Sequence, residues 1–92
     1  MNHREAAERW MKDHPLAMDV YRRLALTALA RGHRIGIAML TERIRWEFIV
    51  SRNTMEEFKI PNNHRAYIAR QLIREIPGLD KILTIHRTMD ES

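Results

Sequence analysis

Four interruptions by proline or glycine set the lengths of the segments into which this chain can fold. The first two are Pro15 and Gly32, which bracket a long stretch with regularly spaced apolar residues. Pro61 precedes a second such stretch, and the pair Pro77-Gly78 ends it. Because proline cannot continue a helix and glycine suits the left-handed residue after one, each interruption predicts a helix boundary. The sequence therefore predicts several short helices within one 92-residue domain.

The periodic stretches predict three principal helices, because apolar residues recur in them at spacings of three and four. They are Pro15–Arg31, Ile35–Ile49 and Asn62–Ile76. Residues 1–13 are expected to form an N-terminal extension or a short helix, and residues 87–92 a flexible tail. The core of this single domain, residues 1–92, is therefore expected to lie within residues 15–86.

Two short stretches that favour β-structure flank the third helix. Phe58-Lys59-Ile60 alternates apolar and polar residues, and Ile82–His86 is rich in β-branched residues. The two are expected to pair as a two-stranded ribbon. The fold class predicted is mainly α, with the element list of a helix-turn-helix or winged-helix domain. A tight turn at residues 32–34 leaves open a second arrangement, in which the helix 35–49 is the inserted one.

Composition excludes several classes of protein. The chain has no cysteine, so disulfides and thiolate metal sites are excluded. The five histidines show no paired metal-ligand spacing on one helix face, and no glycine-rich phosphate loop or nucleophile elbow is present. We therefore expect no enzyme, no metal and no cofactor. No apolar run is long enough to cross a bilayer and the first residues do not read as a secretion signal, so a cytoplasmic protein without a membrane partner is expected.

The outer face of the helix 62–76 carries the residues best suited to recognise DNA. On a helical wheel, the predicted buried stripe is Ala66, Ala69, Leu72, Ile73 and Ile76. The opposite face carries His64, Tyr67, Arg70, Gln71 and Arg74. Arginine and glutamine make bidentate contacts to base edges, and a short basic helix fits the major groove. This pattern also suits an ordinary solvated helix.

The leading hypothesis is a small DNA-binding protein, with a regulatory role, that uses the helix 62–76 for recognition. The predicted phosphate contacts are Arg43, Arg45, Arg52 and Arg65. The net charge of +4 is mild, but thirteen of the 16 basic residues are arginines, which bind phosphate and guanine bidentately. Partners expected under this hypothesis are double-stranded DNA and a second copy of the chain, since small DNA-binding proteins commonly double their contacts by symmetry.

The alternative hypothesis is a non-enzymatic module that binds a host or phage protein, or a second copy of the chain. Its adaptable apolar surface would comprise Met11, Met39, Trp46 and Met55. The same side chains suit the core of the domain, and core filling is the preferred interpretation of Trp46. The three-residue spacing of Arg43 and Trp46 also permits the guanidinium to lie on the indole.

Spaced residues over most of the chain, from Pro15 to Ile85, resemble a set of small uncharacterised proteins from phages and prophages. The first group that carries the resemblance is Pro15, Tyr21, Ala25, Gly32, Ile44, Arg45, Trp46 and Glu47. The second is Phe58, Lys59, Ile60, Asn62, Asn63, Tyr67, Ala69 and Arg70. Pro61 departs from the pattern, which has another asparagine there. The resemblance implies a viral or integrated-viral origin and no particular activity.

Overall fold

Four helices and a two-stranded sheet make up the part of the chain that the computed structural model describes, residues 2–52, 60 and 62–85. The helices are α1 (His3–Asp13), α2 (Pro15–Arg31), α3 (Ile37–Arg52) and α4 (Asn62–Glu75). The strands are β1 (Ile35–Gly36) and β2 (Leu83–Thr84), and the short 3-10 helix η1 (Leu79–Lys81) precedes β2. The prediction of a mainly helical fold is confirmed. None of these helices is long and apolar enough to span a membrane.

Local signals explain where the first two helices begin and end. Asn2 caps α1, because its side-chain oxygen accepts from the Glu5 amide at 2.8 Å while the Glu5 carboxylate accepts from the Asn2 amide at 3.3 Å. Pro15 occupies the first turn of α2, where its missing amide proton costs nothing. Gly32 ends α2 with φ = 70°, a left-handed conformation that favours glycine.

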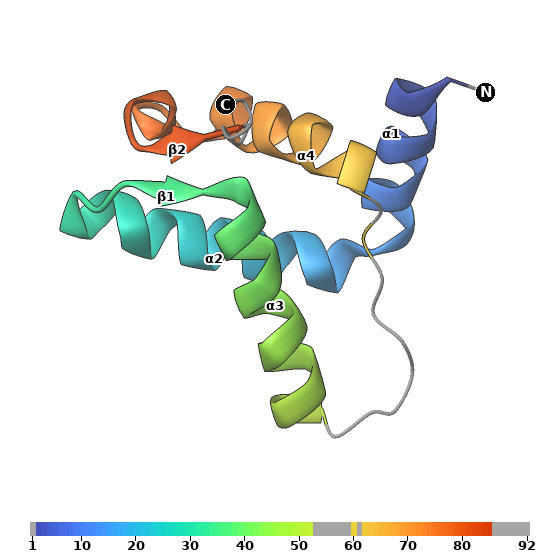
Figure 1. The fold of residues 1–92 in the computed structure, drawn as a ribbon, viewed down its shortest axis with the longest axis horizontal. Helices are drawn as coiled ribbons and strands as arrows, with labels where there is room; N and C mark the ends of the chain where they lie inside the picture. Colours follow the sequence, from blue (N-terminus) through green and yellow to red (C-terminus); the bar gives the residue numbers. More distant parts are fainter. Residues whose placement is uncertain (1, 53–59, 61, 86–92) are drawn as a thin grey trace.

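The sheet differs from the predicted ribbon. β2 lies within the predicted stretch 82–86, but its partner is β1, in parallel, with Ile35 opposite Leu83. Residues 58 and 59 lie outside the described part, and Ile60 is buried outside any strand. The helix predicted to begin at Ile35 therefore begins two residues later, because residues 35 and 36 are extended and pair with β2 (Figure 1).

The core lies where α4 packs against the other elements. Its fully buried large side chains come from four elements, α2, α3, α4 and η1: Tyr21, Leu40, Thr41, Ile44, Ile68, Leu72 and Leu79. Three residues of the stripe predicted for the helix 62–76 are buried, namely Ala69, Leu72 and Ile76, whereas Ala66 and Ile73 are half-buried. Figure 1 shows α1 crossing near the beginning of α4, and α3 projecting away from the other helices.

Candidate nucleic-acid interface

The predicted recognition face of α4 lies beside α1 and forms a shared hollow with it. The hollow has a volume of about 760 Å³. Its lining is Asn2, His3, Arg4, Glu8, Met11, Tyr67, Arg70 and Arg74. The Asn63 side-chain amide donates to Nδ1 of His3 at 2.9 Å and so joins the starts of the two helices. The structure thus brings Tyr67, Arg70 and Arg74 together, as the helical wheel placed them.

Positive charge dominates this hollow. Three arginines line it, Arg4, Arg70 and Arg74, against one acidic residue, Glu8. None of the three guanidinium groups forms an ion pair with a described carboxylate. The Arg70 guanidinium lies over the Tyr67 ring, 5.4 Å from its centroid, and this cation–π contact orients the charge without neutralising it.

His64 does not lie on the exposed face where the wheel placed it. Only 8% of its surface is exposed, and its Nδ1 has no hydrogen-bond partner among the described residues. Burial lowers the pKa of the His64 ring, and the neighbouring His3 ring lowers it further. His64 is thus part of the packed junction between α1 and α4.

Gln71 and Arg65 are held by neighbouring side chains. The Gln71 amide donates to Glu75 Oε2 at 2.7 Å, and its oxygen accepts from Arg74. The Arg65 side chain is 23% exposed, and its terminal nitrogen lies 4.0 Å from a carboxylate oxygen of Glu42. Both the amide nitrogen and the oxygen of Gln71 are therefore already engaged within α4, and a bidentate contact to a base would compete with these hydrogen bonds.

The predicted phosphate contacts on α3 lie away from the hollow and beside carboxylates. Arg45 pairs with Glu42 at 3.1 Å, and Arg43 lies 3.7 Å from Glu47, so its guanidinium is directed there and not to the Trp46 indole. The side chain of Arg52 is outside the described part of the chain. The arginines of α3 and the hollow between α1 and α4 do not form one continuous basic ridge.

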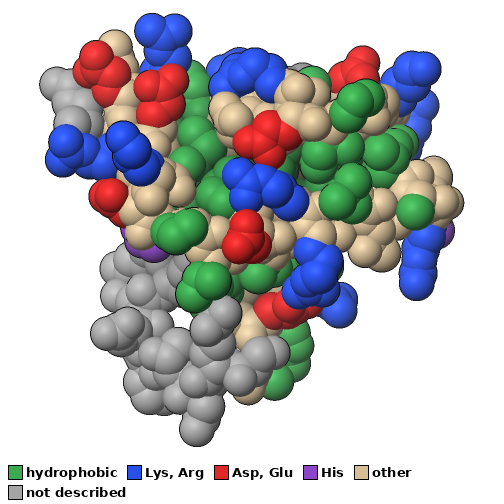
Figure 2. Space-filling view, turned by 180° about the vertical axis from the view of Figure 1, so that it is seen from behind, with side chains coloured by type: hydrophobic (Ala, Val, Ile, Leu, Met, Phe, Trp, Pro, Cys, Tyr) green, Lys and Arg blue, Asp and Glu red, His purple; other side chains and the backbone are tan. Residues whose placement is uncertain are grey.

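The rear face of the molecule shows the same mixing of charge (Figure 2). Acidic and basic side chains stand side by side there over α1 and in the middle of the face. Such pairing also occurs between α2 and α4, where Arg22 binds Glu75 at 2.7 Å and also pairs with Asp19 at 3.0 Å. These contacts raise the pKa of Arg22, and the Arg22 hydrogen bond lowers the pKa of the Glu75 carboxyl.

Sequence reasoning missed two features of the surface. Arg4 lines the hollow only because α1 packs against α4, and the spacing of residues within either helix does not predict that contact. The second feature is on α3, where Met39 and Trp46 are 67% and 63% exposed. The preferred interpretation of Trp46 as a core residue is therefore wrong. Val50 is 55% exposed and extends the same face of α3. The spacing of residues 39, 46 and 50, seven and then four apart, places them on one side of a helix and could have indicated this face. Met55 lies outside the described residues, and Met11 packs against the core.

Together these observations define a small, mainly helical protein with a basic hollow between α1 and α4 and a separate apolar surface on α3. Comparisons with models of protein families, with curated proteins and with solved structures found no match.

Proposed function

We propose that the protein is a non-enzymatic, phage-type DNA-binding protein that contacts the phosphate backbone through the hollow between α1 and α4. The observation that carries the proposal is the convergence of Arg4, Arg70 and Arg74, none of which forms an ion pair with a described carboxylate. Arg74 also donates to Gln71, and its charge acts on the Glu75 carboxyl. Five other arginines each lie within 4.0 Å of a carboxylate oxygen, namely Arg22, Arg23, Arg43, Arg45 and Arg65. Phosphate oxygens accept well from the planar fork of a guanidinium group.

Within this proposal, α4 takes the role that a recognition helix has in a helix-turn-helix domain. Its contribution is to the phosphates more than to the bases, because Gln71 is engaged by Glu75 and Arg74. Backbone contacts position a protein on DNA but carry no sequence information. The expected binding is therefore weak in sequence preference. The resemblance to phage and prophage proteins supports the viral setting.

The test is fluorescence anisotropy of a labelled random duplex, titrated with protein at several salt concentrations. Three neutralised phosphates predict a slope of log K against log salt of roughly −2.7. Arg4→Ala, Arg70→Ala and Arg74→Ala should each reduce the magnitude of that slope by about 0.9. Absence of binding at low salt would overturn the proposal.

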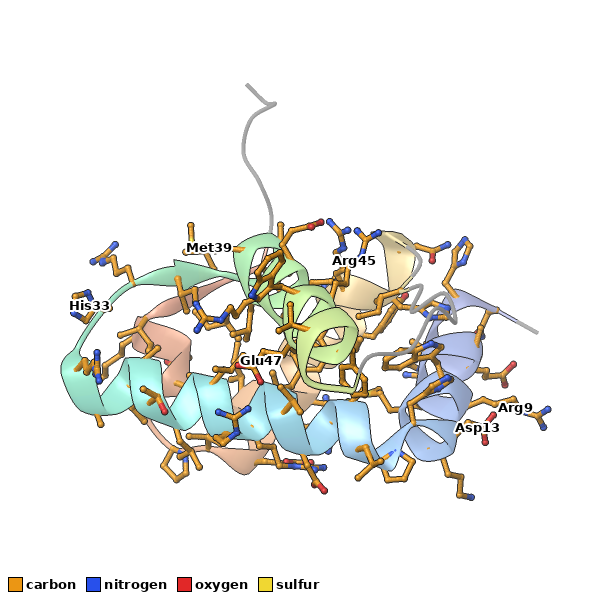
Figure 3. The ribbon with its side chains drawn as sticks, turned by 90° about the horizontal axis from the view of Figure 1, so that it is seen from below. Arg9, Asp13, His33, Met39, Arg45 and Glu47 are labelled. Carbon is orange, nitrogen blue, oxygen red and sulfur yellow. The ribbon has the colours of Figure 1, made fainter. Side chains whose placement is uncertain are left out.

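A matched control is Arg9→Ala. Arg9 is on α1 as Arg4 is, but it does not line the hollow and lies on the outer side of the helix (Figure 3). The variant removes the same charge and should keep most of the salt dependence. If Arg9→Ala and Arg70→Ala weaken binding equally, net charge accounts for the effect and the hollow is not the site.

A second candidate function is a protein-interaction module, and the exposed apolar face of α3 favours it. Met39, Trp46 and Val50 are each more than half exposed on one helix, and exposed apolar patches of this kind commonly mark interaction sites. A pull-down comparing Trp46→Ala with Leu26→Ala tests it, since Leu26 is a similarly exposed apolar residue on α2. A partner retained equally by both variants would exclude the α3 surface as its binding site.

A further inference from the structure

The exposed surface of α3 is a narrow stripe that runs almost the full length of the helix. We call it the α3 ridge, and its residues are Met39, Arg43, Trp46 and Val50. At 100° per residue these four positions fall within about 60° of one another. The seam formed by Ile37, Leu40 and Ile44 on another side of α3 is buried in the core. The helix therefore has one apolar face that is packed and a second that is exposed.

Burial of Ile37, Leu40 and Ile44 in the core turns the α3 ridge outward, and ion pairs lie on both of its flanks. Glu47 accepts from Arg23 of α2 at 2.7 Å, and Glu42 lies 4.0 Å from Arg65 of α4. Figure 3 shows Glu47 directed toward α2, whereas Met39 extends from the other side of α3. Rotation of α3 to bury the ridge would break these contacts and expose the core seam. The ridge is therefore a fixed feature of the surface.

We propose that the partner of the α3 ridge is the same ridge of a second copy of this chain, with the two α3 helices antiparallel. This inference rests on the second candidate function, α3 as an interaction surface, and names its partner. When one ridge is turned end for end against another, apolar residues meet apolar residues and Arg43 meets Trp46. When Met39 is placed opposite Val50 of the partner subunit, Arg43 falls opposite the partner subunit's Trp46, and the same contacts repeat by two-fold symmetry.

The central contact of this arrangement joins a cation to an indole. Tryptophan is the preferred aromatic partner of a guanidinium group, and the antiparallel register supplies two such contacts, one on each side of the two-fold axis. To make them, each Arg43 guanidinium turns from Glu47 of its own chain, 3.7 Å away, to the indole of the partner subunit. A parallel arrangement would instead place Arg43 beside the partner's Arg43 and leave the indoles facing each other. The distribution of charge on the ridge thus selects the antiparallel direction.

Charges beside the ridge support the same direction. Glu42 and Arg45 lie on one flank of α3, a three-residue step apart, and they pair within the chain at 3.1 Å. In an antiparallel pair this flank meets the same flank of the other copy, which brings Glu42 near Arg45 of the partner subunit. Binding of a different protein would not require the ridge to match itself. Because the order of its residues does match itself in the antiparallel direction, it favours a second copy of the chain as partner.

Cysteine crosslinking tests both the partner and its direction, because the natural chain contains no cysteine. Met39→Cys and Val50→Cys replace exposed residues, so both variants are expected to fold. In the proposed register, a mixture of the two variants should form a crosslinked dimer with a short bis-maleimide. Each variant alone should not, because two copies of the same residue would be about 16 Å apart along the helices.

Three outcomes overturn the proposal in different ways. Crosslinking of each variant alone, without enhancement in the mixture, would show a parallel pair. Crosslinking of Leu26→Cys, an exposed control on α2, to the same extent would show random encounter. A monomeric mass by light scattering at all concentrations up to about 1 mM, together with no crosslinked product, would exclude a second copy as partner.

The wild-type protein supplies an independent measurement. Its mass in solution should rise with concentration from the 11.0 kDa of one chain toward twice that value. Trp46→Ala should shift this transition to at least tenfold higher concentration, whereas Leu26→Ala should leave it in place. If the protein is monomeric but Trp46→Ala alone still loses a pulled-down partner, the inference fails while the second candidate function stands. If both effects are missing, both fail.

Discussion

At the centre of the core, the hydroxyl groups of Tyr21 and Thr41 lie 2.8 Å apart and form a hydrogen bond between α2 and α3. Both residues are fully buried. Burial raises the pKa of Tyr21 to about 12, although the Thr41 hydrogen bond and the positive charge of Arg65 act in the opposite direction. The phenol therefore stays neutral at physiological pH and serves as a polar link within an apolar interior.

This link predicts non-additive effects on stability. Tyr21→Phe leaves the Thr41 hydroxyl buried without its partner and should lower the free energy of unfolding by about 1–2 kcal/mol. Thr41→Val should have a similar cost, because it leaves the Tyr21 hydroxyl without its partner. The double variant should lose less than the sum of the two, as measured by urea denaturation.

Thr27→Val is the control, because Thr27 is exposed and its substitution should change stability little. Strictly additive losses in the double variant would contradict the account of the pair as one interaction.

His64 makes the stability of the fold depend on pH. Its pKa in the folded protein is below the ordinary value of 6.5, because its ring is buried and lies near His3. The unfolded chain therefore takes up a proton first as the pH falls. The contribution of neutral His64 is complete above about pH 6.5 and is lost progressively below it. Thermal unfolding followed from about pH 7.5 to 5.5 should show a falling midpoint.

His64→Gln should reduce this slope, and the exposed His33→Gln should not. Equal slopes in the wild-type protein and His64→Gln would assign the pH dependence to other groups.

At the scale of elements, helices were predictable where the chain carries local stop signals. Pro15 and Gly32 bound α2 as expected, and α4 ends one residue before its predicted end. The strand pair was not predictable from the same signals, because two-residue strands contain too little periodicity. β1 is extended because Leu83 and Thr84 lie alongside it, a contact between segments far apart in the chain. The choice of partner was therefore decided by tertiary packing.

The capping box of α1 yields a prediction at this scale. Asn2→Ala removes the acceptor for the Glu5 amide and should cost about 1 kcal/mol of stability. The loss should appear as a lower thermal midpoint by circular dichroism. Arg9→Ala, in the middle of the same helix, should change the midpoint much less. An unchanged midpoint in Asn2→Ala would show that the cap does not hold the start of α1.

At the scale of the whole molecule, the candidate site was predictable only in part. The helical wheel placed Tyr67, Arg70 and Arg74 on one face correctly, because these positions lie opposite the centre of the buried stripe. It misplaced His64, which lies at the edge of that face and is buried beside α1. Neutralisation of an α4 arginine, Arg65, by a carboxylate on α3 depends on how helices pack. Contacts between helices cannot be predicted from the periodicity of one helix alone.

The single acidic residue of the hollow provides a test of its electrostatics. Glu8→Gln removes the negative charge that opposes the three arginines, and should strengthen DNA binding a few-fold at low salt. Asp13→Asn removes the same charge from the outer side of α1 and should have a smaller effect (Figure 3). Anisotropy titrations of the two variants make the comparison. Equal gains would indicate that only net charge matters.

The parallel pair of β1 and β2 also has a consequence for the order of folding. Each strand has only two residues, so the pair cannot offset the entropy of closing the long segment between them. The helices must therefore dock first, and the sheet forms as the final step of folding. By the same reasoning it is the first part to open during unfolding. The amide proton of Ile35, bound to Ile82 oxygen at 2.9 Å, should exchange with deuterated solvent sooner than those inside α4.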